Sequence, residues 1–401
     1  MEVDYEKKSK DAYSSLVVGD QFKGLYDGLD SLLRGDESGE SDESRILKDM
    51  NKYLEEIYQN SSDKSLFYSE LARTLAETRG DVYGTIQTRM QTIQKSYDDS
   101  FTELVNSHNF TRDTGKFSVI YNQGQFKDDT IGVDDYDYRV QGLVYMNEFD
   151  GRNYGNKYGY SLGFTVSRFD FDDAPTYGGK SKEDIYSVRA GIHGVRNFSE
   201  NDTFRLVSRL ELGYNRHETK RTLELDRNYT NKAKYDTYQV TFDNRFEKTL
   251  YRSLTTNLEL YAGVNAEYGS IKNFSESGDG LFLEIKGNDY FSVQPEVGVS
   301  GSRRAYLGKN ISAKLTGDLS YAYELGENYN NNKARVKNGT EGQYDLIRPE
   351  KEEGFFKGKV GLGIEKANNF GVTFEVEARK HDNKKEADLR YGVRFNYKFM
   401  H

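Results

Sequence analysis

Apolar and polar residues alternate strictly near the C-terminus of the chain. One set of positions reads Tyr391, Val393, Phe395, Tyr397 and Phe399, and the intervening set reads Arg390, Gly392, Arg394, Asn396 and Lys398. Because a β-strand has a side-chain period of two, this segment predicts a strand with one aromatic and one charged face. Charges are costly inside a soluble core, whereas a membrane barrel places them in a wet lumen and turns its aromatic residues to lipid.

The same alternation repeats along residues 116–400. Its segments begin near Lys116, Tyr136, Lys157, Asp184, Phe204, Tyr235, Leu254, Tyr290, Ile311, Phe355, Phe370 and Leu389. They amount to about twelve strands, and bacterial single-chain outer-membrane barrels use even numbers. One apolar face, expected to meet lipid, comprises Tyr158, Tyr160, Leu162, Phe164 and Val166. The pattern therefore predicts a transmembrane β fold, an antiparallel up-and-down barrel.

The opposite faces of these strands carry charges of both signs, which can pair with one another in a polar lumen. The residues expected to line the lumen are Ser161, Arg205, Arg209, Glu211, Asp243, Arg245, Glu247, Glu259, Glu375, Glu377 and Arg379. Ser161 lies in a match to G-x-S-x-G, but that nucleophile motif needs a strand–turn–helix context, and here it lies within one strand. We expect the small lumen residues to leave room for a helix; they are Gly159, Ser161, Gly163, Gly191, Gly361 and Gly363.

Short and long connections alternate between the expected strands. The short ones are residues 199–202, 251–253, 307–310 and 366–369, and the long ones include residues 172–183, 226–234, 275–289 and 327–353. Outer-membrane barrels have short periplasmic turns and long external loops. This topology places the C-terminus on the periplasmic rim.

The N-terminal part, residues 1–108, has helical rather than strand periodicity. Leucines at helical spacing (Leu25, Leu29, Leu32 and Leu33) come first, and further helices are expected over residues 46–58, 66–79 and 82–105. In the last of these, a narrow apolar stripe comprises Ile86, Met90, Ile93, Tyr97, Phe101 and Leu104. Its 24 residues would span roughly 36 Å, which is long enough to thread a membrane barrel.

Average composition alone would favour a soluble or disordered protein, since only 35% of the 401 residues are hydrophobic and 30% are charged. The 32 Tyr and 23 Phe contradict disorder, and a barrel with a polar interior explains both observations. The net charge of −9 argues against a nucleic-acid partner, and the absence of cysteine excludes disulfides. The first residues show no export signal. The barrel interpretation therefore implies a fragment of a longer precursor whose signal peptide is absent.

The C-terminal strand also matches a pattern that commits outer-membrane barrels to their assembly machinery. The pattern is polar-x-Gly-x-x-aromatic-x-aromatic, and the residues that carry it are Arg390, Gly392, Phe395 and Tyr397, with Phe399 closing the aromatic face. A helix of pore-threading length, followed by about twelve strands and this signal, resembles the translocator domain of monomeric type V autotransporters. The resemblance covers residues 64–400 and includes Gly80-Asp81-Val82-Tyr83 before the long helix.

The resemblance implies an outer-membrane anchor and translocator that exports an N-terminal passenger to the cell surface without enzymatic activity. Residues 1–63 would be a helical linker or passenger end, residues 64–108 would contain the pore helix (82–105), and residues 109–401 would be the barrel. The implied partners are its own passenger, the barrel-assembly machinery, and outer-membrane lipid and lipopolysaccharide. No cofactor, metal site or catalytic residue is expected, and the barrel is expected to be a monomer.

Two other functions fit a barrel: a porin or solute channel plugged by a helix, and a barrel whose loops act on the cell surface as an adhesin or enzyme. The position of residues 82–105 separates them, since a porin needs no amphipathic N-terminal helix. Some autotransporters cleave their passenger in the pore through an asparagine side chain. Asn106 and Asn109 lie near the expected helix end, but neither forms the Asn-Asn pair associated with that chemistry.

Overall fold

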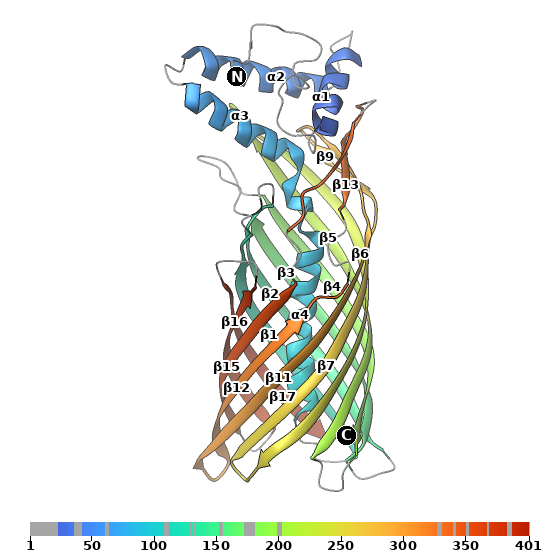
Figure 1. Cartoon of the computed structure of the whole chain (residues 1–401), viewed down its shortest axis with the longest axis vertical. Coiled ribbons are helices and arrows are strands. Elements are labelled where there is room, and N and C mark those ends of the chain that lie inside the picture. The colour runs from blue at the N-terminus through green and yellow to red at the C-terminus, as the bar shows by residue number, and fades with distance from the viewer. Residues whose placement is uncertain are drawn as a thin grey trace.

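The computed structural model describes residues 23–35, 42–60, 64–107, 112–128, 130, 133–151, 155–171, 181–198, 203–326, 331–339, 342–349, 353–366, 369–382 and 387–400. These residues form a tall barrel with helices above one end and one helix inside it (Figure 1). The wall strands are β1 (Asp113–Phe126), β2 (Tyr136–Asp150), β3 (Lys157–Phe171), β4 (Lys182–Asn197), β5 (Phe204–Glu224), β6 (Asn228–Arg252), β7 (Thr256–Ile271), β11 (Asp289–Gly308), β12 (Ile311–Tyr323), β15 (Gly354–Lys366), β16 (Phe370–His381) and β17 (Ala387–Met400).

Each wall strand pairs antiparallel with its neighbours along the chain, and β1 pairs with β17 to close the sheet. The result is a closed, twelve-stranded, up-and-down barrel, which confirms the predicted fold class. Most strands begin within a few residues of their predicted starts. The exception is β6, which begins at Asn228 rather than Tyr235. Its early part belongs to a hairpin with β5 that rises beyond the rest of the wall (Figure 1).

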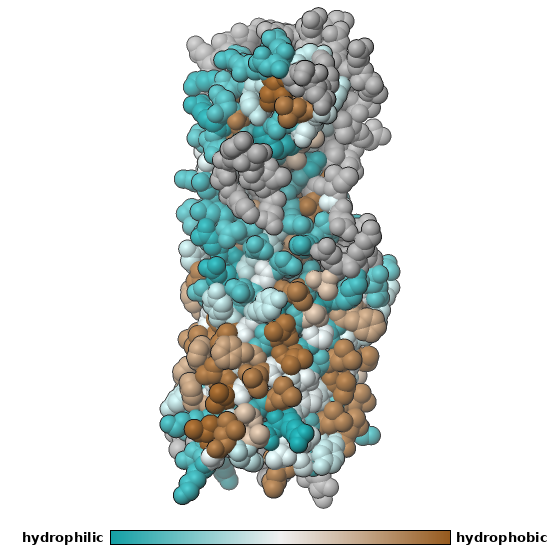
Figure 2. Space-filling view, turned by 90° about the vertical axis from the view of Figure 1, so that its left-hand side faces the viewer, coloured by the Kyte–Doolittle hydropathy of each residue, from teal (hydrophilic) through white to brown (hydrophobic). Residues whose placement is uncertain are grey.

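The wall reverses its polarity partway along the strands. On β3, the outward residues from Tyr158 to Val166 are apolar and exposed, whereas the next outward residues, Arg168 and Asp170, are charged. The inward residues change the other way, and Phe169 and Phe171 are fully buried. Figure 2 shows the apolar residues of one face gathered in the lower half of the molecule. The lower half therefore suits lipid, and the upper half has the surface and the core of a protein in water.

Long connections build a second, smaller sheet at the upper end. It contains β8 (Phe274–Ser275), β10 (Leu283–Lys286), β13 (Lys333–Val336) and β14 (Gln343–Asp345), while β9 (Ser277–Gly278) pairs with the projecting part of β6. We call this end the long-loop rim. The opposite end, where β2–β3, β4–β5, β6–β7, β11–β12 and β15–β16 are joined, is the short-turn rim (Figure 1).

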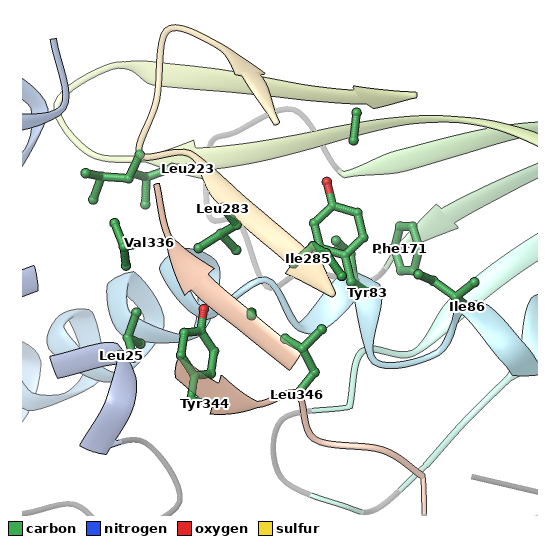
Figure 3. Close-up of a cluster of buried hydrophobic side chains, with 14 of the residues drawn as sticks. Leu25, Tyr83, Ile86, Phe171, Leu223, Leu283, Ile285, Val336, Tyr344 and Leu346 are labelled. Carbon is green, nitrogen blue, oxygen red and sulfur yellow. The ribbon is translucent and has the colours of Figure 1, made fainter. Parts of the chain in front are cut away.

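Three helices, α1 (Lys23–Gly35), α2 (Asp42–Asn60) and α3 (Lys64–Arg79), lie above the long-loop rim, and α1 packs on β13 and β14. Their apolar residues join one cluster with the loop sheet and the upper wall. Figure 3 shows Leu25 of α1 near Val336, Tyr344 and Leu223 in this cluster. Within the described segments, every helix falls short of the length and apolar character needed to cross a membrane.

The predicted helix 82–105 is corrected at its start. Gly80 has a φ of 82°, the chain then makes a short 3₁₀ turn, η2 (Asp81–Tyr83), and α4 begins only at Ile86 and ends at Val105. A Cβ placed on Gly84 would lie 2.1 Å from the carbonyl oxygen of Ile347. The backbone of a loop from far along the chain occupies this space. Local periodicity carries no sign of that contact, so it could not reveal that the helix is interrupted before Ile86.

Candidate functional site

The helix α4 crosses the lumen, with its N-terminal end toward the long-loop rim and its C-terminal end leading into β1 at the short-turn rim (Figure 1). Its predicted apolar stripe is 0–2% exposed throughout; it comprises Ile86, Met90, Ile93, Tyr97, Phe101 and Leu104. The helix packs against β1, β2 and β3. A Cβ on Gly163 of β3 would lie 2.3 Å from Tyr97 Cε2, so the missing side chain makes room for this ring.

Acidic residues on another side of α4 meet basic residues of the last strand. Asp99 forms an ion pair with Arg390 of β17, and Lys359 of β15 lies 3.2 Å from the same carboxylate. One turn later, Glu103 pairs with Arg394 at 2.7 Å. Charge-assisted bonds of this kind are the stronger class of hydrogen bond. The lumen face of the C-terminal strand therefore binds the helix.

Both arginines of β17 are themselves held by the neighbouring strand β16. Arg390 Nη2 lies 2.8 Å from Glu377, and Arg394 donates both Nη1 and Nη2 to Glu375, the former at 2.7 Å. Each arginine thus joins two carboxylates, one from the wall and one from the helix. A mostly buried arginine requires such partners because an unpaired charge there would be costly.

A second set of contacts ties α4 to β4 and β5. Asp98 pairs with Arg209 at 2.5 Å, and Gln94 donates to Glu211 at 2.9 Å. Nearer the long-loop rim, Arg89 pairs with Glu183 at 2.5 Å, where both side chains are fully buried. These contacts fix the rotation of the helix about its axis.

The C-terminal end of α4 is held by a buried lysine of β1. Lys116 donates its Nζ to the carbonyl oxygens of Leu104 and Ser107, at 2.9 and 3.2 Å, and pairs with Glu148. His193 Nε2 lies 3.4 Å from the other oxygen of Glu148. A cation at a helix C-terminus also interacts favourably with the helix dipole.

The helix does not fill the lumen. A cavity of about 640 Å³ remains beside its polar side, with walls from β7, β11, β12 and β15. It reaches the exposed turn between β6 and β7 at the short-turn rim. Asp98, Glu103 and Asn106 of the helix border this space, so their contacts lie next to a region that water can enter.

The Autotransporter beta-domain family model matches residues 116–377, which form most of the barrel wall. The chain belongs to the autotransporter beta-domain family. Among solved structures, it is similar to the translocator domain of the autotransporter NalP from Neisseria meningitidis, at 14% identity and a TM-score of 0.54, over 79% of this chain and 97% of that one. It also matches the beta domain of the Bordetella autotransporter BrkA, at 14% identity and a TM-score of 0.49, over 71% and 99%.

The search of curated proteins found no match. The family assignment makes the barrel of this autotransporter domain an outer-membrane translocator domain. The likeness to the NalP domain supports the fold, since the sequences share few identical residues.

In the autotransporter domain, all the predicted lumen residues lie on the inner side of the wall. Most are buried, and those that keep partial exposure are Arg205, Asp243, Arg245 and Arg379. Arg205 donates to Asn106 at the helix end, and Arg245 pairs with Glu247 at 2.9 Å. Of the five glycines expected beneath the helix, Gly163 is the one where an added Cβ would meet α4; the nearest atoms belong to neighbouring strands at Gly159, Gly191, Gly361 and Gly363.

The proposed assembly signal has two chemically different faces. Phe395 and Tyr397 point outward, 42% and 41% exposed, and the Tyr397 ring lies 5.5 Å from Phe117 of β1. Arg390 and Gly392 face the lumen, and a Cβ on Gly392 would lie 2.3 Å from Asn122 Oδ1. The arginine at the polar position of the signal is therefore also a ligand of the pore helix.

The site residues predicted from the sequence do not include the helix residues that bind the wall. They are Arg89, Gln94, Asp98, Asp99 and Glu103, and their wall partners include Arg390, Arg394 and Lys359. A signal was present, because Lys95, Asp99 and Glu103 recur every four residues and therefore share one helix face. His193 and His217 instead pair with Glu148 and Glu183, and the described residues contain no cluster suited to a metal ion. Asn109 lies outside the described residues.

Proposed function

We propose that the autotransporter barrel carries an N-terminal passenger to the cell surface and then anchors it there, without enzymatic activity. The observation that carries this proposal is the path of the chain. The described residues before α4 lie beyond the long-loop rim, whereas β1 starts at the short-turn rim, and α4 joins the two through the lumen. In an outer-membrane barrel the long loops face outward. The segment before α4 is therefore outside the cell, and a route through the lumen accounts for its position.

The charge pattern supports passage of a chain rather than of a small solute. Wall residues of both signs face the helix, and they bind its backbone carbonyls, carboxylates and amides as well as its one deeply buried arginine, Arg89. The nucleophile-like motif around Ser161 lies inside β3 and is not followed by a helix. This placement fits the proposal of a domain without catalysis.

The division into residues 1–63, 64–108 and 109–401 stays a prediction, as do the partners. In this proposal the assembly machinery reads the outward aromatic residues of β17, lipid and lipopolysaccharide surround the apolar band, and the barrel acts as a monomer. A precursor would carry the passenger and an export signal ahead of this chain.

Export is tested by an epitope fused ahead of Met1, in a precursor that carries an export signal. We expect protease added to intact cells to remove the epitope, because the chain before α4 lies outside, while a periplasmic marker in the same cells stays whole. The control is the same precursor with Gly163→Phe, which blocks the space beside Tyr97. If a folded wild-type barrel keeps its epitope protected until the cells are lysed, the export proposal is wrong.

A solute channel remains the second candidate because the cavity beside α4 connects to the short-turn rim. Planar-bilayer recordings of the purified chain separate the two. A channel function requires steady, open conductance with the helix in place, whereas an anchor needs none.

A further inference from the structure

Residues 77–86 are the part of the chain that leaves the lumen at the long-loop rim, and loops of the barrel surround them. A Cβ on Gly80 would lie 2.5 Å from Leu283 Cδ1, and one on Gly84 would lie 2.1 Å from the carbonyl oxygen of Ile347. Figure 3 shows side chains of β10 directed at this region. Two loops, β7–β11 and β12–β15, therefore contact the backbone of the exiting chain at Gly80 and Gly84, because these residues have no side chain that would keep the loops away.

A buried ion pair between two parts of the barrel lies beside this stretch. Arg221 of β5 donates Nε and Nη2 to the two carboxylate oxygens of Glu276, at 2.7 and 2.6 Å, and their side chains are 2% and 0% exposed. Both residues also bind the exiting chain. Arg221 Nη1 donates to the backbone carbonyl of Glu77 at the end of α3, and Glu276 accepts from the Tyr83 hydroxyl at 2.8 Å.

The β12–β15 loop adds two hydrogen bonds to the same stretch. The Tyr344 hydroxyl donates to the carbonyl oxygen of Arg79 at 2.8 Å, and Asn332 Nδ2 donates to that of Tyr83 at 3.3 Å. Burial, with Glu276 adding to it, raises the pKa of Tyr83 well above its usual value, so the hydroxyl remains a donor at physiological pH.

We propose that Arg221, Glu276, Asn332 and Tyr344 form a latch, a binding site on the barrel for its own exported chain at residues 77–83. The latch can close only after this stretch has left the lumen, because its members belong to the projecting hairpin and to the loops of the long-loop rim. Once closed, it holds α4 in the barrel and prevents the chain from sliding back. Only the direction of passage in this inference rests on the proposed function.

Burial separates the latch from the lumen contacts that border the cavity. There, the side chains of Asp98 and Glu103 are 24% and 23% exposed, so water screens their ion pairs. Arg221 and Glu276 hold each other away from water, and the loss of either leaves a costly buried charge beside residues 77–83. A change in the latch should therefore loosen the helix more than a change at Glu103.

Single-channel recordings of the purified full chain test the latch without requiring export. We expect Glu276→Gln and Arg221→Ala to show bursts to the conductance of a barrel that lacks residues 1–106, at least ten-fold more often than the unaltered chain. Tyr83→Phe removes one hydroxyl and keeps the ring, so it should raise the burst frequency by a smaller factor. It tests the latch even if Glu276→Gln or Arg221→Ala disturbs folding. Heat-dependent gel mobility shows that each barrel is folded.

The matched control is Arg216→Ala, which breaks an exposed ion pair with Asp236 on the outer face of β5 and β6. The frequency of conductance bursts in this variant should equal that of the unaltered chain. Glu103→Gln weakens a lumen contact beside the cavity and should raise the frequency of bursts less than Glu276→Gln does. A burst frequency that is unchanged in Glu276→Gln and Arg221→Ala, or raised mainly by Glu103→Gln, would overturn the latch. Since the recordings use purified protein and do not depend on export, such a result would overturn the latch but not the proposed function, which the epitope experiment tests separately.

Discussion

Arginine placed along the outer face of β5 should report where the membrane ends. Its outward residues from Phe204 to Tyr214 are apolar except for the half-buried Ser208, and they are charged beyond that point, beginning with Arg216. A strand rises about 3.3 Å per residue, and a tilt of about 40° leaves roughly 2.5 Å of height per residue. The segment from Phe204 to Tyr214 therefore covers about 25 Å, which equals the height of the apolar band of outer-membrane barrels.

These heights set the expected costs. Leu210 lies about 2.5 Å from the middle of the band, so Leu210→Arg should lower the free energy of unfolding by about 2–4 kcal/mol. Tyr214→Arg, near the edge, should cost about 0–1 kcal/mol. Glu218 lies about 22 Å from the middle. Glu218→Arg should cost no more than about 1 kcal/mol, because it loses only an exposed ion pair with Lys234.

Reversible urea unfolding in phospholipid vesicles measures these differences. The chain contains no tryptophan, so the folded fraction is read from gel mobility without heating. The reasoning is refuted if Leu210→Arg costs no more than Glu218→Arg, since the polarity reversal on β5 would then not mark the edge of the bilayer.

Three further outcomes follow from the lumen and the last strand. Phe395→Asp with Tyr397→Asp should abolish surface display, since two charges on the lipid face cost about 1–4 kcal/mol each and remove the aromatic signal; Lys398→Ala should do far less, and normal display of the double variant on immunoblots of intact cells would contradict this. Deleting residues 1–106 should leave a barrel with larger single-channel conductance, and an unchanged conductance would show that the helix is not the plug. Gly163→Val should shift the helix by overpacking, costing about 1–3 kcal/mol in urea unfolding, and a cost below that of an exposed substitution would argue against close helix–wall contact.

Much of the wall was predictable because strand periodicity is local. The outward face of β3 and nearly all strand starts could be read from alternation alone, as could the apolar stripe of α4. The early start of β6 was missed because residues 228–234 are mostly polar. Those residues belong to the part of the hairpin that stands in water, where the apolar residues Tyr229 and Ala233 face inward.

The sequence by itself determined which side of each strand meets lipid and which helix suits the lumen, since side-chain direction follows from a period of two or 3.6 residues. Tertiary structure alone decided which charges meet. Asp99 finds Arg390 and Arg221 finds Glu276 because barrel closure and the rotation of α4 bring distant residues together. The start of α4 was also decided at this level, because the loop carbonyl of Ile347 occupies the space beside Gly84. Local periodicity carries no information about contacts across so long a sequence separation.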